Sequence, residues 1–167
     1  MNPMREIRIA KVTLNMGVGE PGEKLELAKE LLEKISGTKA VKTKAKKRVP
    51  SWGIRPGLEI GVKTTVRGEK AVELLKKLFA AVNNRISASN FDDHGNLSFG
   101  IKEYIHIPGM KYDPKYGIVG LDVCVTLERP GYRVKRRRFK SKIGKRHLIT
   151  KDEAIQFFKD KFGVEIV

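Results

Sequence analysis

Residues 38–67 read TKAVKTKAKKRVPSWGIRPGLEIGVKTTVR, and the rest of the chain is organised around this stretch. Two strand-like segments flank a basic loop at 45–57 that carries the only tryptophan, Trp52. From residue 58 to 67, Leu, Ile, Val, Thr and Val alternate with Glu, Gly, Lys, Thr and Arg. A period of two predicts a strand with one face in the core and an outward face that carries Lys63, Thr65 and Arg67.

Apolar periodicity on both sides of this stretch predicts the remaining elements. Upstream we expect a strand at 7–16, a helix at 23–36 and an edge strand at 39–44. Downstream we expect a helix at 69–82, a strand from 97 that continues to 107, a strand at 118–128, and a last helix that starts after Thr150. The fold class is therefore α+β, a mainly antiparallel sheet with helices packed on one face, which leaves its other face and two basic loops for a partner considered below. We expect a single domain, residues 1–167, with basic loops projecting at 45–57 and 129–147.

Composition restricts where the protein works. The chain is 40% hydrophobic, yet no segment approaches the roughly 20 apolar residues of a membrane span. The first residues, MNPMREIRIAKV, do not resemble an export signal. Cys124 is the only cysteine, which excludes an internal disulfide and suits a reducing compartment. We therefore expect a cytoplasmic protein with no membrane partner.

Positive charge is concentrated in two stretches. Residues 38–67 contain nine Lys or Arg and one acid, and residues 129–147 contain ten Lys or Arg and no acid. These stretches carry +8 and +10 of a chain whose total is +16, so the remainder carries −2. A solvated surface normally mixes signs, so this separation favours a polyanion as partner.

The sequence offers no catalytic or metal constellation. His94, His106 and His147 are not at metal-ligand spacing, and Asp92 with Asp93 is typical of a turn. We predict a protein that is not an enzyme and has no cofactor or metal. Two alternatives stay open: a DNA-compacting protein that uses the same cations, and a nuclease, for which Glu59 is the only acid near the first basic loop.

RNA is favoured over duplex DNA because the cations lie in predicted loops and on a sheet face, not along a helix that would fit a major groove. Trp52 and Tyr132 accompany them as stacking groups, although Trp52 is equally suited to bracing its loop.

Several motifs resemble the ribosomal protein L5 family, in its archaeal form. They follow one another in the family's order: KVTLNMGVGE at 11–20, ISGTK at 35–39 with TKAKK at 43–47, IGVKTTVRGE at 60–69, FDDHGNLSFGIKE at 91–103 and GLDV at 120–123. The resemblance covers most of the chain. Residues 129–147 have no counterpart in bacterial members, which also commonly carry Gln where Thr38 stands.

The resemblance implies a structural protein that binds 5S rRNA in the central protuberance of the large ribosomal subunit. It implies further contacts with large-subunit rRNA, P-site tRNA and neighbouring ribosomal proteins, including one in the small-subunit head. The 5S rRNA contacts implied are Asn15, Met16, Gly17, Thr38, Lys39, Thr43, Lys44, Lys63, Thr65 and Arg67. The projecting loop implied to reach tRNA supplies Lys47, Arg48, Ser51, Trp52 and Arg55. To the second basic stretch we assign other RNA contacts, by Arg133, Lys135, Arg136, Arg137, Arg138, Lys140 and Lys142.

Overall fold

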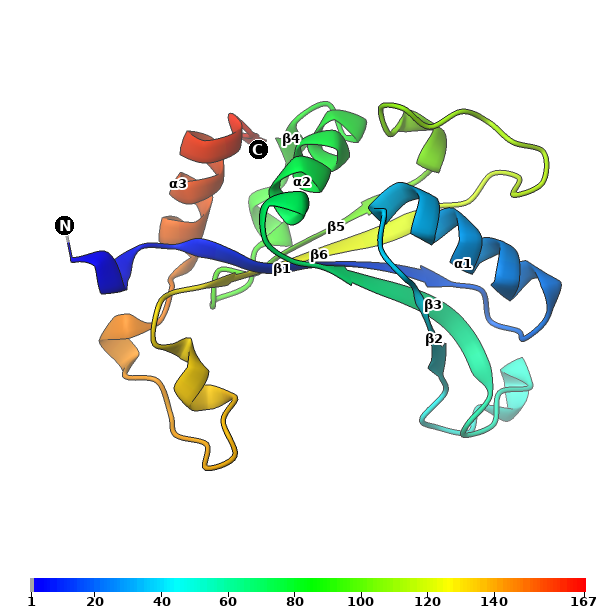
Figure 1. Cartoon of the computed structure of the whole chain (residues 1–167), viewed down its shortest axis with the longest axis horizontal. Helices are drawn as coiled ribbons and strands as arrows, with labels where there is room; N and C mark the ends of the chain where they lie inside the picture. The colour runs from blue at the N-terminus through cyan, green and yellow to red at the C-terminus, as the bar shows by residue number, and fades with distance from the viewer. Residues whose placement is uncertain (1) are drawn as a thin grey trace. The chain divides into compact units, whose positions relative to one another are not determined.

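The computed structural model describes residues 2–167 and has the predicted α+β architecture (Figure 1). Five strands form an antiparallel sheet in the order β2-β3-β1-β6-β5. Their bounds are β1 (Arg8–Gly17), β2 (Val41–Lys44), β3 (Glu59–Val66), β5 (Leu97–Ile101) and β6 (Leu121–Glu128). The α-helices are α1 (Glu23–Ser36), α2 (Glu69–Ala81) and α3 (Lys151–Phe162). A small parallel sheet pairs β4 (Arg85–Ile86) with β7 (Glu165–Ile166).

The chain forms two compact units. The hairpin unit comprises Thr13–Val66 and Gly100–Val123. The terminal unit comprises the N-terminal stretch as far as Val12, together with Arg67–Phe99 and Cys124–Val167. That the whole chain folds as a single domain stays a prediction.

The core of the hairpin unit lies between α1 and the sheet. Helix α1 buries the face that its periodicity predicts, namely Leu25, Ala28, Leu31, Leu32 and Ile35. It packs on β3, whose Val62 and Val66 are buried. Gly37 then ends the helix in the left-handed conformation, at φ 66°, which glycine adopts without a steric penalty. One face of β3 is thus covered, and the other faces outward.

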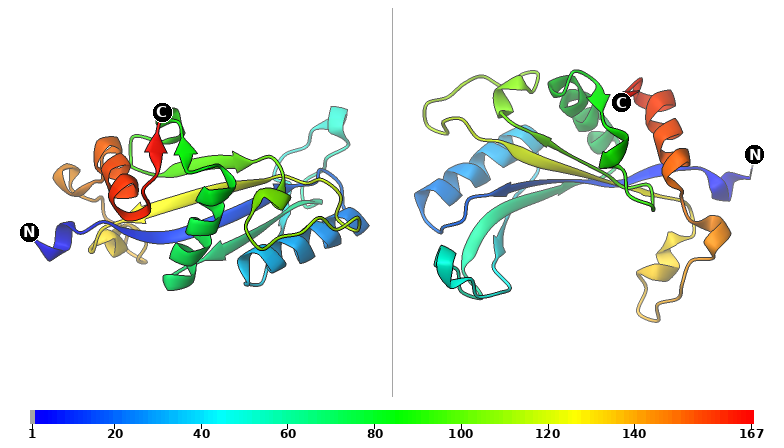
Figure 2. Two further views of the ribbon diagram at one scale, coloured as in Figure 1. Left: turned by 90° about the horizontal axis from the view of Figure 1, so that it is seen from above. Right: turned by 180° about the vertical axis from the view of Figure 1, so that it is seen from behind.

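The core of the terminal unit is aromatic. Phe79 of α2 stacks on Phe99 of β5 at 5.6 Å between ring centroids and meets Phe158 of α3 edge-on at 5.9 Å. Helices α2 and α3 accordingly lie side by side (Figure 2). The predicted capping box is present at the start of α3, where the Thr150 hydroxyl accepts from the Glu153 N–H and the Glu153 carboxylate accepts from the Thr150 N–H.

Several strands are shorter than predicted, β5 and β6 by the most; β2 starts at Val41 and not at residue 39. Strand β5 ends at Ile101, and Tyr104–His106 forms a 3₁₀ turn, so the extension to residue 107 was wrong. The Tyr104 ring is buried there, and its hydroxyl accepts from the Asp113 N–H at 3.0 Å, which holds the following loop. Strand β6 starts at Leu121 and not at residue 118. Glycine is required just before it, because a Cβ at Gly120 would come within 2.7 Å of the Lys102 carbonyl oxygen.

Candidate nucleic-acid interface

Strand β3 presents an outward face with the predicted composition. Val62, Thr64 and Val66 are buried, whereas Lys63 and Thr65 are exposed, as is Arg67, which follows the strand. Lys63 has no ion-pair partner in the described part of the chain. The alternation read from the sequence is therefore confirmed, and it leaves cations and a hydroxyl available to an external partner.

Strand β2 extends this face. It pairs antiparallel with β3, placing Val41 opposite Lys63 and Thr43 opposite Gly61. Side chains on directly opposed residues share one face of a sheet, so Thr43 lies on the same face as Lys63. Gly61 is needed there, because a Cβ would come within 2.8 Å of the Thr43 Oγ1. Lys44, at the end of β2 beyond a register shift, is also exposed.

Lys42 belongs to the opposite, helix-covered face. Its ammonium group hydrogen-bonds to Glu26 of α1 and lies 3.3 Å from a carboxylate oxygen of Glu59. The hydrogen bond to Glu26, followed by that to Glu59, raises the pKa of Lys42 above its ordinary value. Lys42 is thus engaged within the protein and does not contribute a free cation to the outward face.

The Thr38 side chain is tied into a cluster of hydroxyl groups. Its Oγ1 lies 2.8 Å from the Oγ1 of the buried Thr64 and 3.1 Å from the Oγ of Ser36, to which it donates. The Ser36 hydroxyl donates in turn to the Leu32 carbonyl at 2.8 Å. This cluster fixes the turn after α1. Lys39, the next residue, is exposed.

The three residues predicted at the end of β1 differ in what they expose. Asn15 is half-buried, Gly17 is exposed, and Met16 is buried in the core with 1% exposure. They line a depression of the hairpin unit together with residues 100–102 and 120–122. Met16 offers a partner only its backbone, because its side chain is enclosed.

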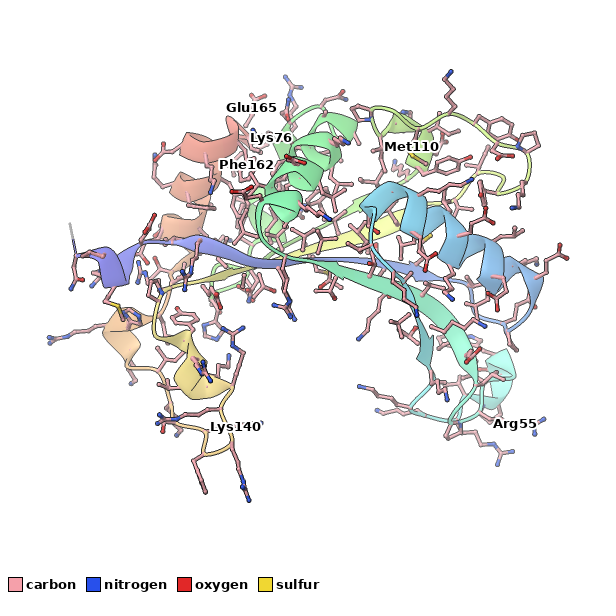
Figure 3. The ribbon with its side chains drawn as sticks, viewed as in Figure 1. Arg55, Lys76, Met110, Lys140, Phe162 and Glu165 are labelled. Atoms are coloured by element: carbon pink, nitrogen blue, oxygen red, sulfur yellow. The ribbon has the colours of Figure 1, made fainter. Side chains whose placement is uncertain are left out.

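The loop at 45–57 has its own hydrogen-bonded frame. The Ala45 N–H donates to the Leu58 carbonyl and the Gly57 N–H to the Ala45 carbonyl, closing the base, while Val49 and Ile54 exchange hydrogen bonds near the tip. The predicted tRNA-contacting side chains are all exposed: Lys47, Arg48, Ser51, Trp52 and Arg55. Trp52 is 75% exposed, so it does not brace the loop, and Arg55 points away from the hairpin (Figure 3).

In the terminal unit, the segment 129–147 exposes most of its cations, including Lys140 at its tip (Figure 3). Arg136 is exposed, but its charge is neutralised within the protein, because its guanidinium forms an ion pair with Glu128 at 2.6 Å. Arg137 donates to the Phe139 carbonyl and the Ser141 hydroxyl, which shapes the turn. The remaining predicted contacts have no carboxylate partner among residues 2–167: Arg133, Lys135, Arg138, Lys140 and Lys142.

Arg129 does not belong to this exposed set. Its side chain is 3% exposed and its guanidinium donates to the carbonyls of Arg5, His147 and Leu148 and, at 2.7 Å, to Glu153. In the sequence Arg129 is one cation of a uniform basic run. In the structure it lies at the start of that run and hydrogen-bonds both to the end of the run, at His147, and to Glu153 of α3.

Neither a metal-binding cluster nor a membrane-spanning helix is present among the described residues. Residues 2–167 contain no group of three or more His, Cys, Asp or Glu side chains arranged to hold a metal ion. Nor do they contain a helix that is long and apolar enough to span a membrane.

Comparison with known proteins identifies the family. A model described as "Ribosomal protein L5" matches residues 2–55, and a second model, for the C-terminal part of the same ribosomal family, matches residues 59–157. The chain belongs to the ribosomal protein L5 family. Among its relatives named "Large ribosomal subunit protein uL5", that of Nanoarchaeum equitans is 61% identical over 99% of both chains. That of Sulfurisphaera tokodaii is 54% identical over all of this chain and 96% of its own.

Membership of the L5 family gives the chain a general function. It is a structural protein of the large ribosomal subunit, working in the cytoplasm with ribosomal RNA, and not an enzyme. Both of these relatives are archaeal, in agreement with the resemblance to the archaeal form.

Three groups that line a cavity of this L5-family protein were not predicted from the sequence: Lys11, Asn96 and Thr126. Lys11 lies on β1 in the parity opposite to the buried Val12, Leu14 and Met16, so alternation along 11–16 was the signal that places it outward. Asn96 and Thr126 also line a cavity of the terminal unit with Lys11. No sequence signal joins them, because they come from three distant segments.

Proposed function

We propose that this ribosomal protein binds 5S rRNA, in the central protuberance of the large subunit, through the outward face of β3 and β2. One observation carries the proposal: β3 sorts its residues into a buried apolar face and an exposed face with Lys63, Thr65 and, directly after it, Arg67. Exposed cations without carboxylate partners neutralise phosphates and release counterions, which supplies most of the affinity for RNA.

The other proposed 5S rRNA contacts accompany this face in the hairpin unit. Hydroxyl and amide groups position a backbone and read its 2′-hydroxyls, which cations alone do not do. The set comprises Asn15, the Met16 backbone, Gly17, Thr38, Lys39, Thr43 and Lys44.

The two basic loops take separate roles in the proposal. The loop at 45–57 contacts P-site tRNA through Lys47, Arg48, Ser51, Trp52 and Arg55, since an exposed indole beside cations suits a folded RNA surface. The segment 129–147 binds RNA of the large subunit. A protein in the small-subunit head is a further partner.

Removal of two charges from the outward face tests the proposal. Lys63→Ala with Arg67→Ala should weaken 5S rRNA binding by about tenfold to a hundredfold, and each lost phosphate contact should lower the slope of log K against log salt by about 1. Because both side chains are exposed, the thermal unfolding midpoint should not change.

The matched control removes the same charge elsewhere. Lys76 and Lys77 are exposed on α2, so Lys76→Ala with Lys77→Ala should change 5S rRNA affinity much less. An equal loss in both double variants, measured by filter binding, would reduce the interaction to net charge and contradict the proposed face.

A further inference from the structure

A cavity of about 280 Å³ opens in the terminal unit, outside the contacts proposed above apart from Arg67, Lys135 and Arg136 on its rim. Its walls come from β1, the turn at 92–96, the end of β6 and the segment 129–147. Sites for drug-sized ligands occupy roughly 300–1,000 Å³, so this cavity suits one small planar group and excludes a helix of nucleic acid.

The floor of the cavity is apolar and includes an immobilised aromatic ring. Leu127 and Leu148 line it beside Tyr132. The Tyr132 hydroxyl donates to the His147 carbonyl at 3.2 Å and accepts from the Ile149 N–H at 3.0 Å. A ring held in this way is preorganised, so a flat group that stacks on it costs little side-chain entropy.

Two polar side chains in the wall have unused hydrogen-bonding capacity. The Asn96 side-chain N–H donates to the Asp92 carboxylate at 2.7 Å, which leaves the side-chain oxygen, Oδ1, without a partner among the described residues. The Thr126 hydroxyl has no partner there either. An acceptor and a hydroxyl beside an apolar floor are suited to the edge of a nucleobase.

The rim carries more positive charge than the protein neutralises. Lys11, Arg67 and Lys135 line the cavity without a carboxylate partner in the described chain. The carboxylate in the lining, Glu128, is already engaged by Arg136 at 2.6 Å. Cations around an apolar pocket match a phosphate attached to a base.

We infer that this cavity binds one unpaired nucleotide of RNA, its base on Tyr132 and its phosphate at the rim formed by Lys11, Arg67 and Lys135. Free phosphate would make no favourable contact with the apolar floor, and bases in a duplex are stacked on one another and cannot enter. The inference rests on the proposed RNA-binding function, but it concerns the terminal unit and does not depend on 5S rRNA being the partner.

The test is an NMR titration of the labelled protein with a single-stranded RNA tetranucleotide of mixed sequence. Saturable shifts are expected at the Asn96 side-chain amide and the Thr126 and Lys135 backbone amides. Thr126→Phe fills the cavity without removing charge and should weaken the affinity measured at these signals about tenfold, because the base can no longer stack on Tyr132. Ser98→Phe, on an exposed position of β5 outside the lining, should leave this affinity unchanged.

A second pair of variants covers the case in which Thr126→Phe fails to fold. Lys135→Ala should weaken the tetranucleotide affinity at these signals several-fold, and Lys76→Ala, at an exposed position of α2 outside the lining, should not. The inference is overturned if inorganic phosphate or an RNA duplex shifts the same signals equally well, or if no saturable shift occurs. It is also overturned if Lys76→Ala weakens the affinity as much as Lys135→Ala does.

Parallel filter binding of 5S rRNA distinguishes failure of the proposed function from failure of the cavity. Loss of 5S specificity refutes the proposed function, whereas an unchanged tetranucleotide affinity in Thr126→Phe refutes only the cavity.

Discussion

At the scale of single residues, Arg129 shows how one cation of a basic run can be structural. Among the described residues it is the one charged side chain that is buried, and four groups accept from its guanidinium. A buried charge is tolerated only when it is paired and hydrogen-bonded, which these contacts accomplish.

Replacing Arg129 with Met should lower the free energy of unfolding by about 2–3 kcal/mol, because the carbonyls and Glu153 lose their donor. Urea denaturation measures this change. Arg138→Met supplies the control. Arg138 is exposed, its guanidinium lies 5.7 Å from the Phe139 ring, and it has no ion pair among residues 2–167, so its effect should stay within about 0.5 kcal/mol. Equal small effects would show that the Arg129 contacts contribute nothing.

Glu153 makes stability depend on pH. Burial alone would raise its pKa, but hydrogen bonds from the Thr150 N–H and the Arg129 guanidinium outweigh burial and lower the pKa below its ordinary value. A carboxyl with a lowered folded-state pKa stabilises the protein fully above its unfolded-state pKa, and this stabilisation is lost as pH falls through the folded-state pKa.

Glu153→Gln should therefore be less stable than the wild type at pH 7, and the difference should shrink as the pH falls below about 4. Urea midpoints across this range measure the change. Glu73→Gln, at an exposed α2 position without an ion pair in residues 2–167, should follow the wild type throughout. A difference between wild type and Glu153→Gln that persists undiminished at acid pH would contradict the assignment.

Residue alternation predicted the outward face of β3 correctly, because burial on one side of a strand enforces a period of two. The same reasoning failed for Arg129 because a run of cations in a loop has no period. Its burial depends on Arg5 and Glu153, 124 and 24 residues away in sequence. Contacts of this kind arise from tertiary structure and leave no local pattern.

At the scale of elements, the long periodic helices and strands were predictable, whereas the short ones were not. Helix α3 matched its capping signal at Thr150 and Glu153. Strands β4 and β7 have two residues each, too few for any period, and they exist because residues 165–166 lie beside Arg85–Ile86. The 3₁₀ turn at Tyr104–His106 interrupts an apolar run that periodicity alone would extend.

The loop between β2 and β3 is separable from the proposed 5S rRNA face. Replacing residues 47–55 by a short glycine-containing turn leaves the hydrogen bonds among Ala45, Gly57 and Leu58, which close the hairpin. The variant should keep its 5S rRNA affinity within about twofold, since the cations of β3 remain. In reconstituted ribosomes it should lose chemical protection of P-site tRNA. A large fall in 5S affinity with intact folding would show that this loop is part of the 5S interface.

At the scale of the whole molecule, charge is sorted by segment. Outside the two basic stretches many charges are paired within the protein, as Lys24 is with Glu20 and Lys115 with Glu30, whereas the cations of 38–67 and 129–147 are largely unpaired. A protein that needed only solubility would intersperse the two signs. The net charge of +16 is therefore concentrated where RNA contacts are proposed.

The central claim is that these surfaces recognise a particular RNA and do not merely attract polyanions. Competition filter binding tests it most directly, with labelled 5S rRNA displaced by unlabelled 5S rRNA, an unrelated RNA of equal length, or duplex DNA at one salt concentration. We predict that 5S rRNA competes at least about a hundredfold better than either of the others. Equal competition by all three would show a general nucleic-acid-binding protein and contradict the account.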